Sequence, residues 1–549
     1  MVFNPSPQQA DFIDEAATGT GSIVLIAVAG AGKSTTILQA AQRVRGNSII
    51  LAFNKSIATE LKDKLKFAGV DWKKAEAATV HSIGLRNLRK AFPNIRTNGD
   101  KVANICAALI EKGDIGPSLQ PHSAVICKLV SLAKQNAVGV IGSIHDHSIW
   151  DDIVEHFDLF DEEPIQKKGD EIIEWAAKIL DMSNKDTVIC DFDDMVYLPV
   201  LYADRIPFFT YDQVMLDEAQ DTNDARRLLA RCLLKKNRDT GEIIGRLFAV
   251  GDPHQAIYGF TGADNDSLEI IKREFNAKEM PLTVTYRCPK NVVKFAKTWV
   301  SHIEAHPSAP DGKISSSTFE DMMQQRDRLN ADAAILCRNT RPLVNAAFAL
   351  IRERIPCRIE GRDIGESLKK LALRWKGIST IPELEDKLED WADTEVRKWT
   401  AKKKMAKVQE IEDKVETLKV IMSRCLEEGK HEIAFVTAYI DEIFADNVSG
   451  ILTLATIHRS KGREWERVFW LDRLNTCPSK YATMDWEKEQ EINLQYVAAT
   501  RSKNELIDLY PPNPKAAKPQ PANDNKKAAN DNKKGEQLDL LNMPAKGVA

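Results

Sequence analysis

A glycine-rich segment that ends in a lysine and a serine is the first group of residues suited to chemistry. Residues 27–34 read AVAGAGKS, after an apolar run and before a helical pattern from Thr35 to Arg43. Glycines let backbone N–H groups approach phosphate oxygens, and the start of a helix adds positive potential. We therefore expect Lys33 to reach the β and γ phosphates of a nucleotide and Ser34 to ligate Mg²⁺. The remaining loop residues of this predicted phosphate site are Ala29, Gly30, Ala31, Gly32 and Thr35.

An acidic pair, Asp217 and Glu218, follows a second apolar run at residues 214–216. Asp217 suits the Mg²⁺ shell, and Glu218 suits a general base for an attacking water. The pair alone could equally be surface charge. Together with the phosphate loop it favours phosphoryl transfer with ATP and Mg²⁺ as cofactors.

A third string, residues 251–263, reads GDPHQAIYGFTGA. Its Gln255 is suited to sense a phosphate. Tyr258 and Phe260 are two residues apart, so an extended chain would present both rings on one face, where bases can stack. The alternative is that both rings belong to a buried core.

These residues follow short apolar runs at residues 23–28, 49–53, 214–216 and 247–250. Such runs, rich in Val and Ile and bounded by turn residues, are typical of buried parallel strands. Helical patterns separate them, so the predicted fold class is α/β. The polar residues lie at the strands' carboxyl ends, where ligands bind in open α/β sheets.

The rest of the chain has a different pattern. A second strand-rich region is expected from about Leu282, with strands at 333–337, 451–457 and 467–471. Helical, charged residues dominate 366–447, where a basic cluster spans Arg397 to Lys407. A solvated helix face is the favoured interpretation of this cluster, and a DNA-backbone contact is the alternative. The low-complexity segment from residue 511 onward is predicted to be disordered.

Composition excludes several classes of protein. The chain of 549 residues has 76 basic and 80 acidic side chains, which excludes a uniformly basic coat protein. No apolar run is long enough for a transmembrane helix, and the first residues lack a secretory pattern. The nine cysteines include no C-x-x-C pair, which is typical of reduced thiols. We therefore expect a cytoplasmic protein without a membrane partner.

Taken in order, the motifs resemble those of the UvrD/Rep-type DNA helicases of superfamily 1A. The resemblance runs from Gln9 to Arg501 and implies two RecA-like parallel-sheet domains with helical insertions. Its expected boundaries are residues 1–88 and 186–285 for domain 1A, 89–185 for insert 1B, 286–365 and 448–510 for domain 2A, 366–447 for a short insert 2B, and 511–549 for a disordered tail.

The resemblance also implies roles for individual residues. Gln9 would read the adenine edge, Tyr286 would stack on adenine, and Glu464 would hold the ribose. Gln255 would couple the γ-phosphate to DNA, Arg287 would contact that phosphate, and Arg501 would act as an arginine finger. The residues expected to contact DNA are Phe53, Asn54, His81, Tyr258, Phe260 and His458.

The sequence departs from the family pattern at three points. Thr35 replaces an arginine that often packs on adenine, and Thr261 replaces the arginine of an R-G-A motif. The 366–447 insert is also shorter than the family's usual 2B subdomain. The resemblance therefore does not imply the family's nucleotide selectivity or one of its ATP–DNA coupling contacts. It also does not imply duplex contacts by the 2B subdomain.

The implied activity is ATP-dependent movement 3′ to 5′ on single-stranded DNA with unwinding of forked duplex, in repair, recombination or replication. One alternative is a DNA-stimulated translocase that displaces proteins with little unwinding. Another is a non-catalytic DNA-binding subunit, which the intact motif residues disfavour. A fused nuclease has only the acidic string at 360–363 in its favour. The tail holds a peptide that resembles a bacterial sliding-clamp-binding motif: Gln537, Leu538, Asp539, Leu540 and Leu541.

Overall fold

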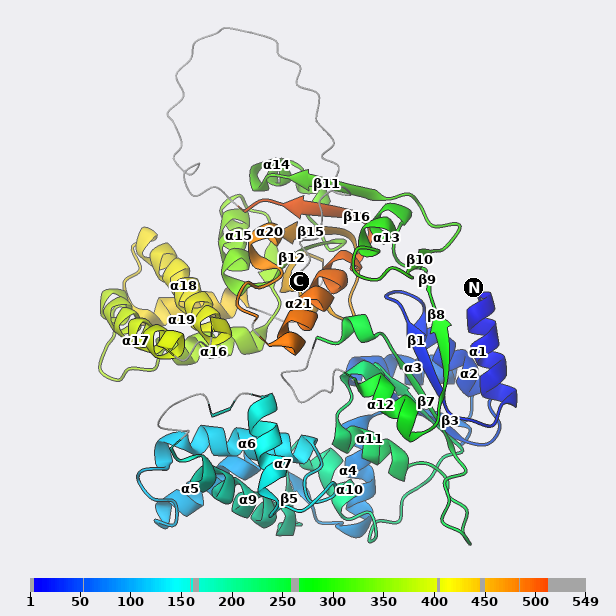
Figure 1. The fold of residues 1–549 in the computed structure, drawn as a ribbon. Coiled ribbons are helices and arrows are strands. Elements are labelled where there is room, and N and C mark those ends of the chain that lie inside the picture. The colour runs from blue at the N-terminus through cyan, green and yellow to red at the C-terminus, as the bar shows by residue number, and fades with distance from the viewer. Residues whose placement is uncertain are drawn as a thin grey trace. The chain divides into compact units, whose positions relative to one another are not determined.

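The computed structural model describes residues 4–52, 54–157, 159–160, 167–257, 266–401, 405–444, 450–482 and 484–511. The chain divides into two compact units, residues 1–283 and 284–549. Each unit is built on its own six-stranded sheet, and every pair of neighbouring strands in both sheets is parallel (Figure 1).

The sheet of the first unit has the strand order β3-β2-β6-β7-β1-β8. Side chains alternate between the faces of a strand, so burial of consecutive residues means that both faces are covered. In the first strand Val24 packs in the core beneath one face, while Ile23 and Leu25 are buried on the other. The strands are β1 (Ile23–Ala27), β2 (Ser48–Ala52), β3 (Ala75–Thr79), β6 (Gln213–Asp217), β7 (Arg246–Gly251) and β8 (Lys278–Leu282).

Helices are interleaved with these strands in the described part of this unit. Their starts follow local capping rules: in the first helix Ser6 caps the N-terminus, Pro7 takes the first turn and Gln9 completes a capping box. The helices are α1 (Pro7–Thr18), α2 (Lys33–Arg43), α3 (Lys55–Phe67), α4 (Val80–Ala91), α10 (Asp194–Leu201), α11 (Asp224–Cys232) and α12 (Ser267–Glu274).

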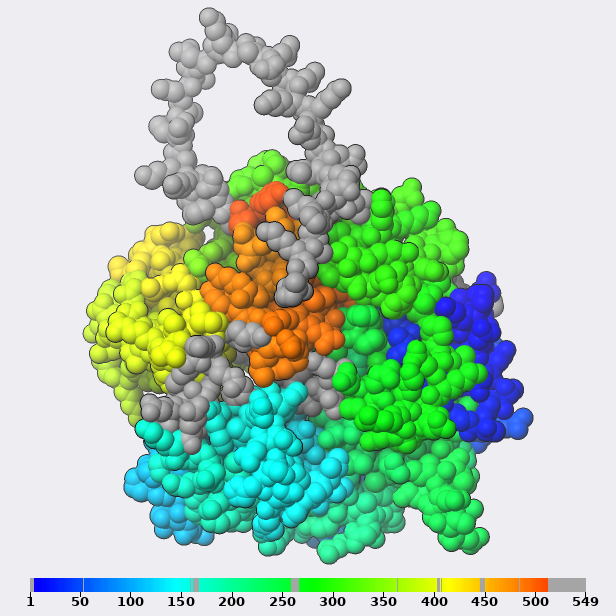
Figure 2. Space-filling view, viewed as in Figure 1, coloured from blue at the N-terminus to red at the C-terminus, as the bar shows by residue number. Residues whose placement is uncertain are grey.

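A helical part is inserted between β3 and β6, and it forms one closely packed block of the first unit (Figure 2). A separate core that includes Leu129, Trp150 and Ile179 lies inside it. A two-stranded parallel ribbon joins its ends. The elements are β4 (Arg96–Thr97), α5 (Lys101–Glu111), α6 (Ser123–Gln135), α7 (His147–His156), α9 (Gly169–Lys185) and β5 (Ile189–Cys190).

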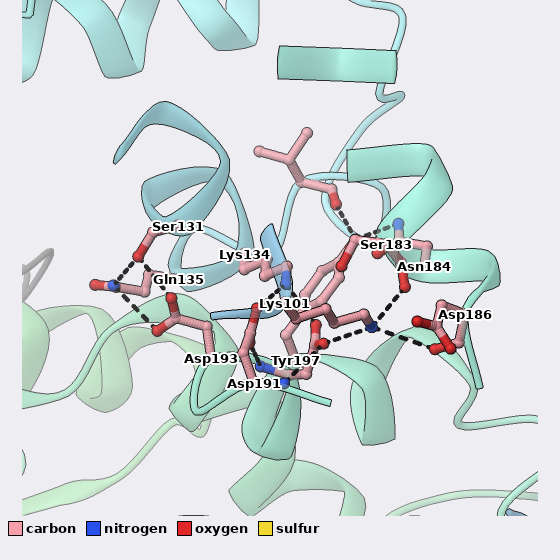
Figure 3. A network of polar contacts seen from close by, with 12 residues as sticks. Lys101, Ser131, Lys134, Gln135, Ser183, Asn184, Asp186, Asp191, Asp193 and Tyr197 are labelled. Carbon is pink, nitrogen blue, oxygen red and sulfur yellow. Dashed lines mark hydrogen bonds and ion pairs between the residues drawn. The ribbon is translucent and has the colours of Figure 1, made fainter. Parts of the chain in front are cut away.

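A buried network of two lysines and two aspartates ties this helical part together (Figure 3). Lys101 lies 2.7 Å from Asp194, and Lys134 lies 2.6 Å from Asp191 and 2.7 Å from Asp194. Lys101 also donates to the carbonyl oxygen of Ser183 at 2.8 Å. The network therefore fastens the 190–194 segment to α5, α6 and α9.

The sheet of the second unit has the order β11-β16-β15-β12-β14-β13. Its apolar core includes Ile335, Leu454 and Phe469 from three neighbouring strands. The strands are β11 (Lys313–Ser317), β12 (Ala333–Cys337), β13 (Cys357–Ile359), β14 (Leu452–Thr456), β15 (Trp465–Leu471) and β16 (Ser502–Leu509).

A short parallel ribbon and several helices complete the second unit. The helices of residues 362–443 gather beside its sheet as one lobe (Figure 1). The elements are β9 (Val284–Thr285), β10 (Glu304–Ala305), α13 (Lys290–Ala296), α14 (Phe319–Gln324), α15 (Thr340–Arg352), α16 (Arg362–Ala372), α17 (Ile381–Ala401), α18 (Met405–Glu427), α19 (Ile433–Ile443), α20 (Arg473–Thr476) and α21 (Asp485–Ala499).

The predicted α/β class with two parallel sheets is confirmed, and the predicted strands agree with the structure to within a few residues. The second strand-rich region, expected from about Leu282, begins in the structure at Val284, and strand β8, which ends at Leu282, pairs with β1 in the first sheet. All nine cysteines are free thiols. Among the described residues no helix is both long and apolar enough to cross a membrane.

Candidate functional site

The predicted phosphate loop connects β1 to α2 at the carboxyl edge of the first sheet. Gly30 and Gly32 have φ angles of 72° and 78°, which glycine adopts without the steric cost that other residues meet. The loop is fixed at its start because the N–H of Val28 donates to Leu282 at 3.0 Å. Helix α2 begins at Lys33 without a side-chain cap, which leaves its first N–H groups suited to an anion.

Gln9 packs against this loop. Its Nε2 donates to the carbonyl oxygen of Ala31 at 3.2 Å, and a Cβ added to Gly32 would lie 3.0 Å from the same nitrogen. The side chain is buried, and its oxygen accepts from the N–H of Ser6 at 3.0 Å. The structure thus places Gln9 at the loop, whereas adenine recognition stays a prediction.

Both residues of the acidic pair meet the phosphate loop. The Nζ of Lys33 lies 2.9 Å from Oε2 of Glu218, and the Oγ of Ser34 donates to Oδ2 of Asp217 at 3.2 Å. Asp217 ends β6, and Glu218 follows with a left-handed φ of 51°. Non-glycine residues hold that conformation only where the surrounding structure enforces it, and such residues cluster at functional sites.

Two further polar residues of the site were missed by the sequence analysis. Asp252 follows β7, is 1% exposed and accepts from Nε2 of Gln255 at 2.6 Å. Gln220 bridges the cluster, because its Nε2 donates to Glu218 at 2.7 Å and its Oε1 accepts from the N–H of Asp252 at 3.1 Å. The rule that singled out Asp217, a polar residue directly after a buried strand, also identifies Asp252.

Charges in this cluster shift one another's protonation. Burial raises the pKa of Asp217 to about 6, and the neighbouring Glu218 adds to that rise. Burial also raises the pKa of Asp252. Burial alone would lower the pKa of Lys33, but Glu218, Asp252 and Asp217 reverse this and hold it above its ordinary value. The lysine is therefore a fixed cation among three carboxyl groups.

The donor set fits Mg²⁺ in the manner expected of a phosphate site. Mg²⁺ takes oxygen ligands and commonly uses one or two protein groups together with substrate phosphates. The hydroxyl of Ser34 and the carboxylate of Asp217 supply such oxygens. Among the described residues no cluster of three His, Cys, Asp or Glu side chains is arranged to hold a metal alone.

The residues predicted to contact DNA in the first unit are partly described. Asn54 is exposed and caps α3 by accepting from the N–H of Ile57 at 2.9 Å. His81 lines a cavity of about 130 Å³ together with Asn223 and Arg226. Burial lowers the pKa of His81 to about 4, with a contribution from Arg226, so it is neutral at physiological pH. The other residues predicted to contact DNA in this unit, Phe53, Tyr258 and Phe260, lie outside the described residues. So does Thr261, which departs from the family pattern.

An exposed aromatic residue beside His81 was not predicted from the sequence. Phe192 is 66% exposed, and its ring meets that of His81 edge-on with centroids 6.4 Å apart. An exposed ring of this kind is suited to base stacking. Asp191 and Asp194, which lie one and two residues from Phe192 in the chain, belong to the buried network of Figure 3, so this network fixes the segment that carries the ring.

The second unit brings together two residues that were predicted to act on the nucleotide. Nε of Arg287 lies 2.6 Å from Oε2 of Glu464. Burial raises the pKa of this glutamate and the positive charge of Arg287 lowers it, and the pKa is lowered overall. Tyr286, beside Arg287, is 44% exposed. Roles at a γ-phosphate, ribose or adenine stay predictions for these residues.

Two other predicted residues of the second unit are more enclosed. Arg501 is 1% exposed. Its Nε donates to the carbonyl oxygen of Val497 at 2.9 Å, and its Nη1 donates to the carbonyl oxygen of Arg463 at 3.2 Å. His458 begins the short helix η6 (His458–Ser460), and burial lowers its pKa to about 3 with contributions from Arg338, Arg459 and Lys461. It is neutral at physiological pH.

Comparison with protein families gives two matches. Residues 7–276 match the UvrD/REP helicase N-terminal domain, and residues 364–510 match the UvrD-like helicase C-terminal domain. Together the two matches span most of the chain.

Individual relatives are distant. The F-box DNA helicase protein 1 of Schizosaccharomyces pombe is 21% identical over 516 residues, which cover 88% of this chain and 54% of the relative. The ATP-dependent DNA helicase UvrD1 of Mycobacterium tuberculosis is 25% identical over 320 residues, 54% of this chain and 39% of the relative. The ATP-dependent DNA helicase Rep of Buchnera aphidicola is 24% identical over 302 residues, 51% and 43% respectively. The chain spans about half or less of the length of these relatives.

Proposed function

Because the chain belongs to the UvrD/Rep family of superfamily 1 helicases, we propose that it is an ATP-driven DNA helicase that moves 3′ to 5′ along one strand and separates the duplex. The observation that carries this proposal is the chain of contacts from Lys33 through Glu218, Gln220 and Asp252 to Gln255. This chain leads from a phosphate loop to the segment that carries the predicted base-stacking residues Tyr258 and Phe260.

The first unit would bind and hydrolyse ATP. Backbone N–H groups at Gly30 to Ser34 receive the phosphates, and Ser34 and Asp217 hold Mg²⁺, which neutralises phosphate charge when bound. When ATP binds, the ammonium group of Lys33 leaves Glu218 and pairs with the phosphates, because the carboxylate and the phosphates compete for it. Glu218, held by Gln220, then accepts a proton from the attacking water.

The second unit would supply positive charge and base recognition. We assign Arg287 to the γ-phosphate and Arg501 to the role of arginine finger, a contribution worth about 10³–10⁵ in rate in related phosphoryl transfers. Glu464 would hold the ribose and Tyr286 the adenine. The family resemblance supports these assignments.

Single-stranded DNA would contact Asn54, His81 and Phe192 in the first unit and His458 in the second. Both histidines are neutral, so they suit hydrogen bonds or ring contacts with bases more than ion pairs with phosphates. Stacking accepts any base, at about 1–3 kcal/mol each, so binding would be sequence-independent.

The decisive experiment is ATP hydrolysis by the purified protein with and without single-stranded DNA, with Lys33→Ala as the control. We expect strong stimulation by DNA, lost in the variant. Strand separation on forked duplexes with 3′ or 5′ tails then tests direction, and activity only on 5′ tails contradicts the proposal. Hydrolysis that ignores DNA breaks the coupling between the phosphate loop and the DNA-contacting residues.

A second candidate function is displacement of bound proteins with little unwinding. The insert at residues 366–447 is shorter than the family's usual 2B subdomain, and this favours the second function. Duplex separation benefits from surfaces that hold the duplex, and a short insert offers less of such a surface. Comparing displacement of a DNA-bound protein with unwinding of bare duplex separates the two functions.

We also retain the proposal that the tail peptide 537–541, which lies outside the described residues, tethers the chain to a bacterial sliding clamp. A clamp pull-down that is unchanged by Leu540→Ala with Leu541→Ala contradicts this proposal.

A further inference from the structure

The second unit contains an aromatic pair that the proposed mechanism does not use in full. The ring of Tyr286 packs against the imidazole of His306, with centroids 4.9 Å apart and planes inclined by 32°. We propose that His306 is a positioning residue for the nucleotide base: it supports one face of Tyr286 and so sets the affinity for adenine without touching the phosphates. This inference rests on the proposed function, because it takes Tyr286 as the base platform.

The backbone brings the two rings together. Strands β9 and β10 run parallel and pair Val284 with Glu304 and Thr285 with Ala305. Tyr286 and His306 each lie one residue beyond the last pair, and the N–H of His306 donates to Thr285 at 3.1 Å. Successive pairs of a ladder share the same spacing, so the side chains at these positions are neighbours.

The imidazole is held in one orientation. Its Nδ1 accepts from the N–H of Ser308 at 3.2 Å and lies 2.7 Å from the Oγ of the same serine. Nδ1 is therefore an acceptor, which places the ring proton on Nε2 in the neutral form. The N–H of Ala309 donates to His306 at 2.8 Å and closes a turn with Pro307 in its second position. Few rotamers remain open to His306.

The loop that follows is fastened to helix α13. The N–H groups of Lys290 and Asn291 donate to Pro310 and Asp311, each at 2.9 Å, and the side chain of Asn291 donates to Gly312 at 3.1 Å. His306 thus stands on a fixed support. A tyrosine ring that is already supported loses less rotamer freedom when a base stacks on it, which strengthens binding by pre-organisation.

The support acts on the base and not on the charged groups. The guanidinium of Arg287 donates to Glu464 at 2.6 Å and to the carbonyl oxygen of Thr500 at 3.4 Å, and neither bond involves the imidazole. Removing His306 should therefore weaken recognition of adenine and leave the phosphate chemistry intact. Aromatic pairing contributes about two- to tenfold in an equilibrium constant beyond simple burial.

The test compares His306→Ala with His306→Phe, which restores a ring. The measurements are KM for ATP and kcat at saturating single-stranded DNA, and the inhibition constant of inorganic tripolyphosphate, which has no base. We expect His306→Ala to raise KM about two- to tenfold, to leave kcat and tripolyphosphate inhibition unchanged, and to be rescued by His306→Phe. His431→Ala, at an exposed histidine of the helical lobe, is the matched control.

The outcomes separate this inference from the proposed function. An unchanged KM in His306→Ala, alongside a raised KM in Tyr286→Ala, overturns the role of His306 only. A Tyr286→Ala variant with normal KM overturns both the base platform and its support, while DNA-stimulated hydrolysis still upholds the helicase proposal. Equal losses of kcat and tripolyphosphate binding in His306→Ala mean a merely structural role and also overturn the inference.

Discussion

Two buried clusters of lysine and carboxyl groups in the first unit differ in charge balance. In the phosphate cluster Lys33 faces three carboxyl groups, those of Asp217, Glu218 and Asp252. In the helical part Lys101 and Lys134 face Asp191 and Asp194. The first cluster has an excess of carboxyl groups, and the second has equal numbers of each charge.

The difference indicates what each cluster is for. Buried ions are costly unless they are paired, so a balanced network is complete in itself and serves to hold the chain in one arrangement. An excess of buried carboxyl groups destabilises the folded state, because the surplus negative charge has no partner. It suits a site that receives positive charge from a bound cation such as Mg²⁺. A lysine buried among carboxylates therefore does not by itself indicate a functional site. The two kinds of site differ in the numbers of positive and negative groups that each cluster contains.

The largest expected effect is on stability in the balanced network. Asp194→Asn removes the shared partner of Lys101 and Lys134 and leaves buried positive charge, so the free energy of unfolding should fall by about 3–5 kcal/mol. Urea denaturation of the nucleotide-free protein measures it.

The control removes one complete ion pair, Lys134→Met with Asp191→Asn, and keeps the pair of Lys101 and Asp194 at 2.7 Å. This double variant should be more stable than Asp194→Asn. The reverse order would show that charge balance does not govern the network.

The same isosteric change in the phosphate cluster should affect catalysis instead. Glu218→Gln is expected to slow ATP hydrolysis at least about 10²-fold, because the amide cannot accept the proton of water. Its free energy of unfolding should change by less than about 1 kcal/mol, since loss of one carboxylate relieves repulsion while Asp217 and Asp252 still face Lys33. A loss of stability as large as that of Asp194→Asn would remove the distinction between the clusters.

The pH dependence of stability provides a third comparison. The pKa of Asp217 is raised to about 6, against an ordinary value of 3.8. Between these values the folded state keeps a proton that the unfolded state has lost, so stability falls as pH rises through this window. The contribution is about 1–3 kcal/mol, measured from pH 4 to 6.5 as the difference between wild type and Asp217→Asn. Parallel curves for the two proteins would exclude Asp217 as the source.

The smallest effect is expected from the residue that bridges the carboxyl groups. Gln220→Ala removes the 2.7 Å hydrogen bond to Glu218 and should lower kcat for ATP hydrolysis about tenfold. If Gln220 acts through Glu218, adding this change to Glu218→Gln produces no further loss. Additive losses in the double variant would assign Gln220 a separate role.

The sequence was most informative where a strand is apolar and ends in a polar residue. The strand at 333–337 was predicted with its correct limits, because five apolar residues lie between Asp332 and Arg338. Lys33, Ser34, Asp217 and Glu218 were predicted as one site and do meet in the structure. Catalytic roles for them stay predictions.

Other features depend on partners distant in sequence. Strand β11, with the sequence KISSS, has no apolar pattern and is a strand because it pairs with β16. The partners of Asp194 are 60 and 93 residues away, at Lys134 and Lys101, and no local pattern connects them. His306 likewise reaches Tyr286 only through the short ribbon of β9 and β10.

The strand order of the first sheet also governs when the phosphate site can form during synthesis. Strand β1 pairs only with β7, which starts at Arg246, and β8, which starts at Lys278. A ribosome adds about 5–20 residues per second, so this apolar strand waits for on the order of ten seconds or longer without its neighbours. The helical part, with closer partners, can assemble in the meantime. ATP-binding competence therefore arises late in the biogenesis of this unit, and a nascent chain stalled before residue 246 would carry the phosphate loop without the two strands that flank β1.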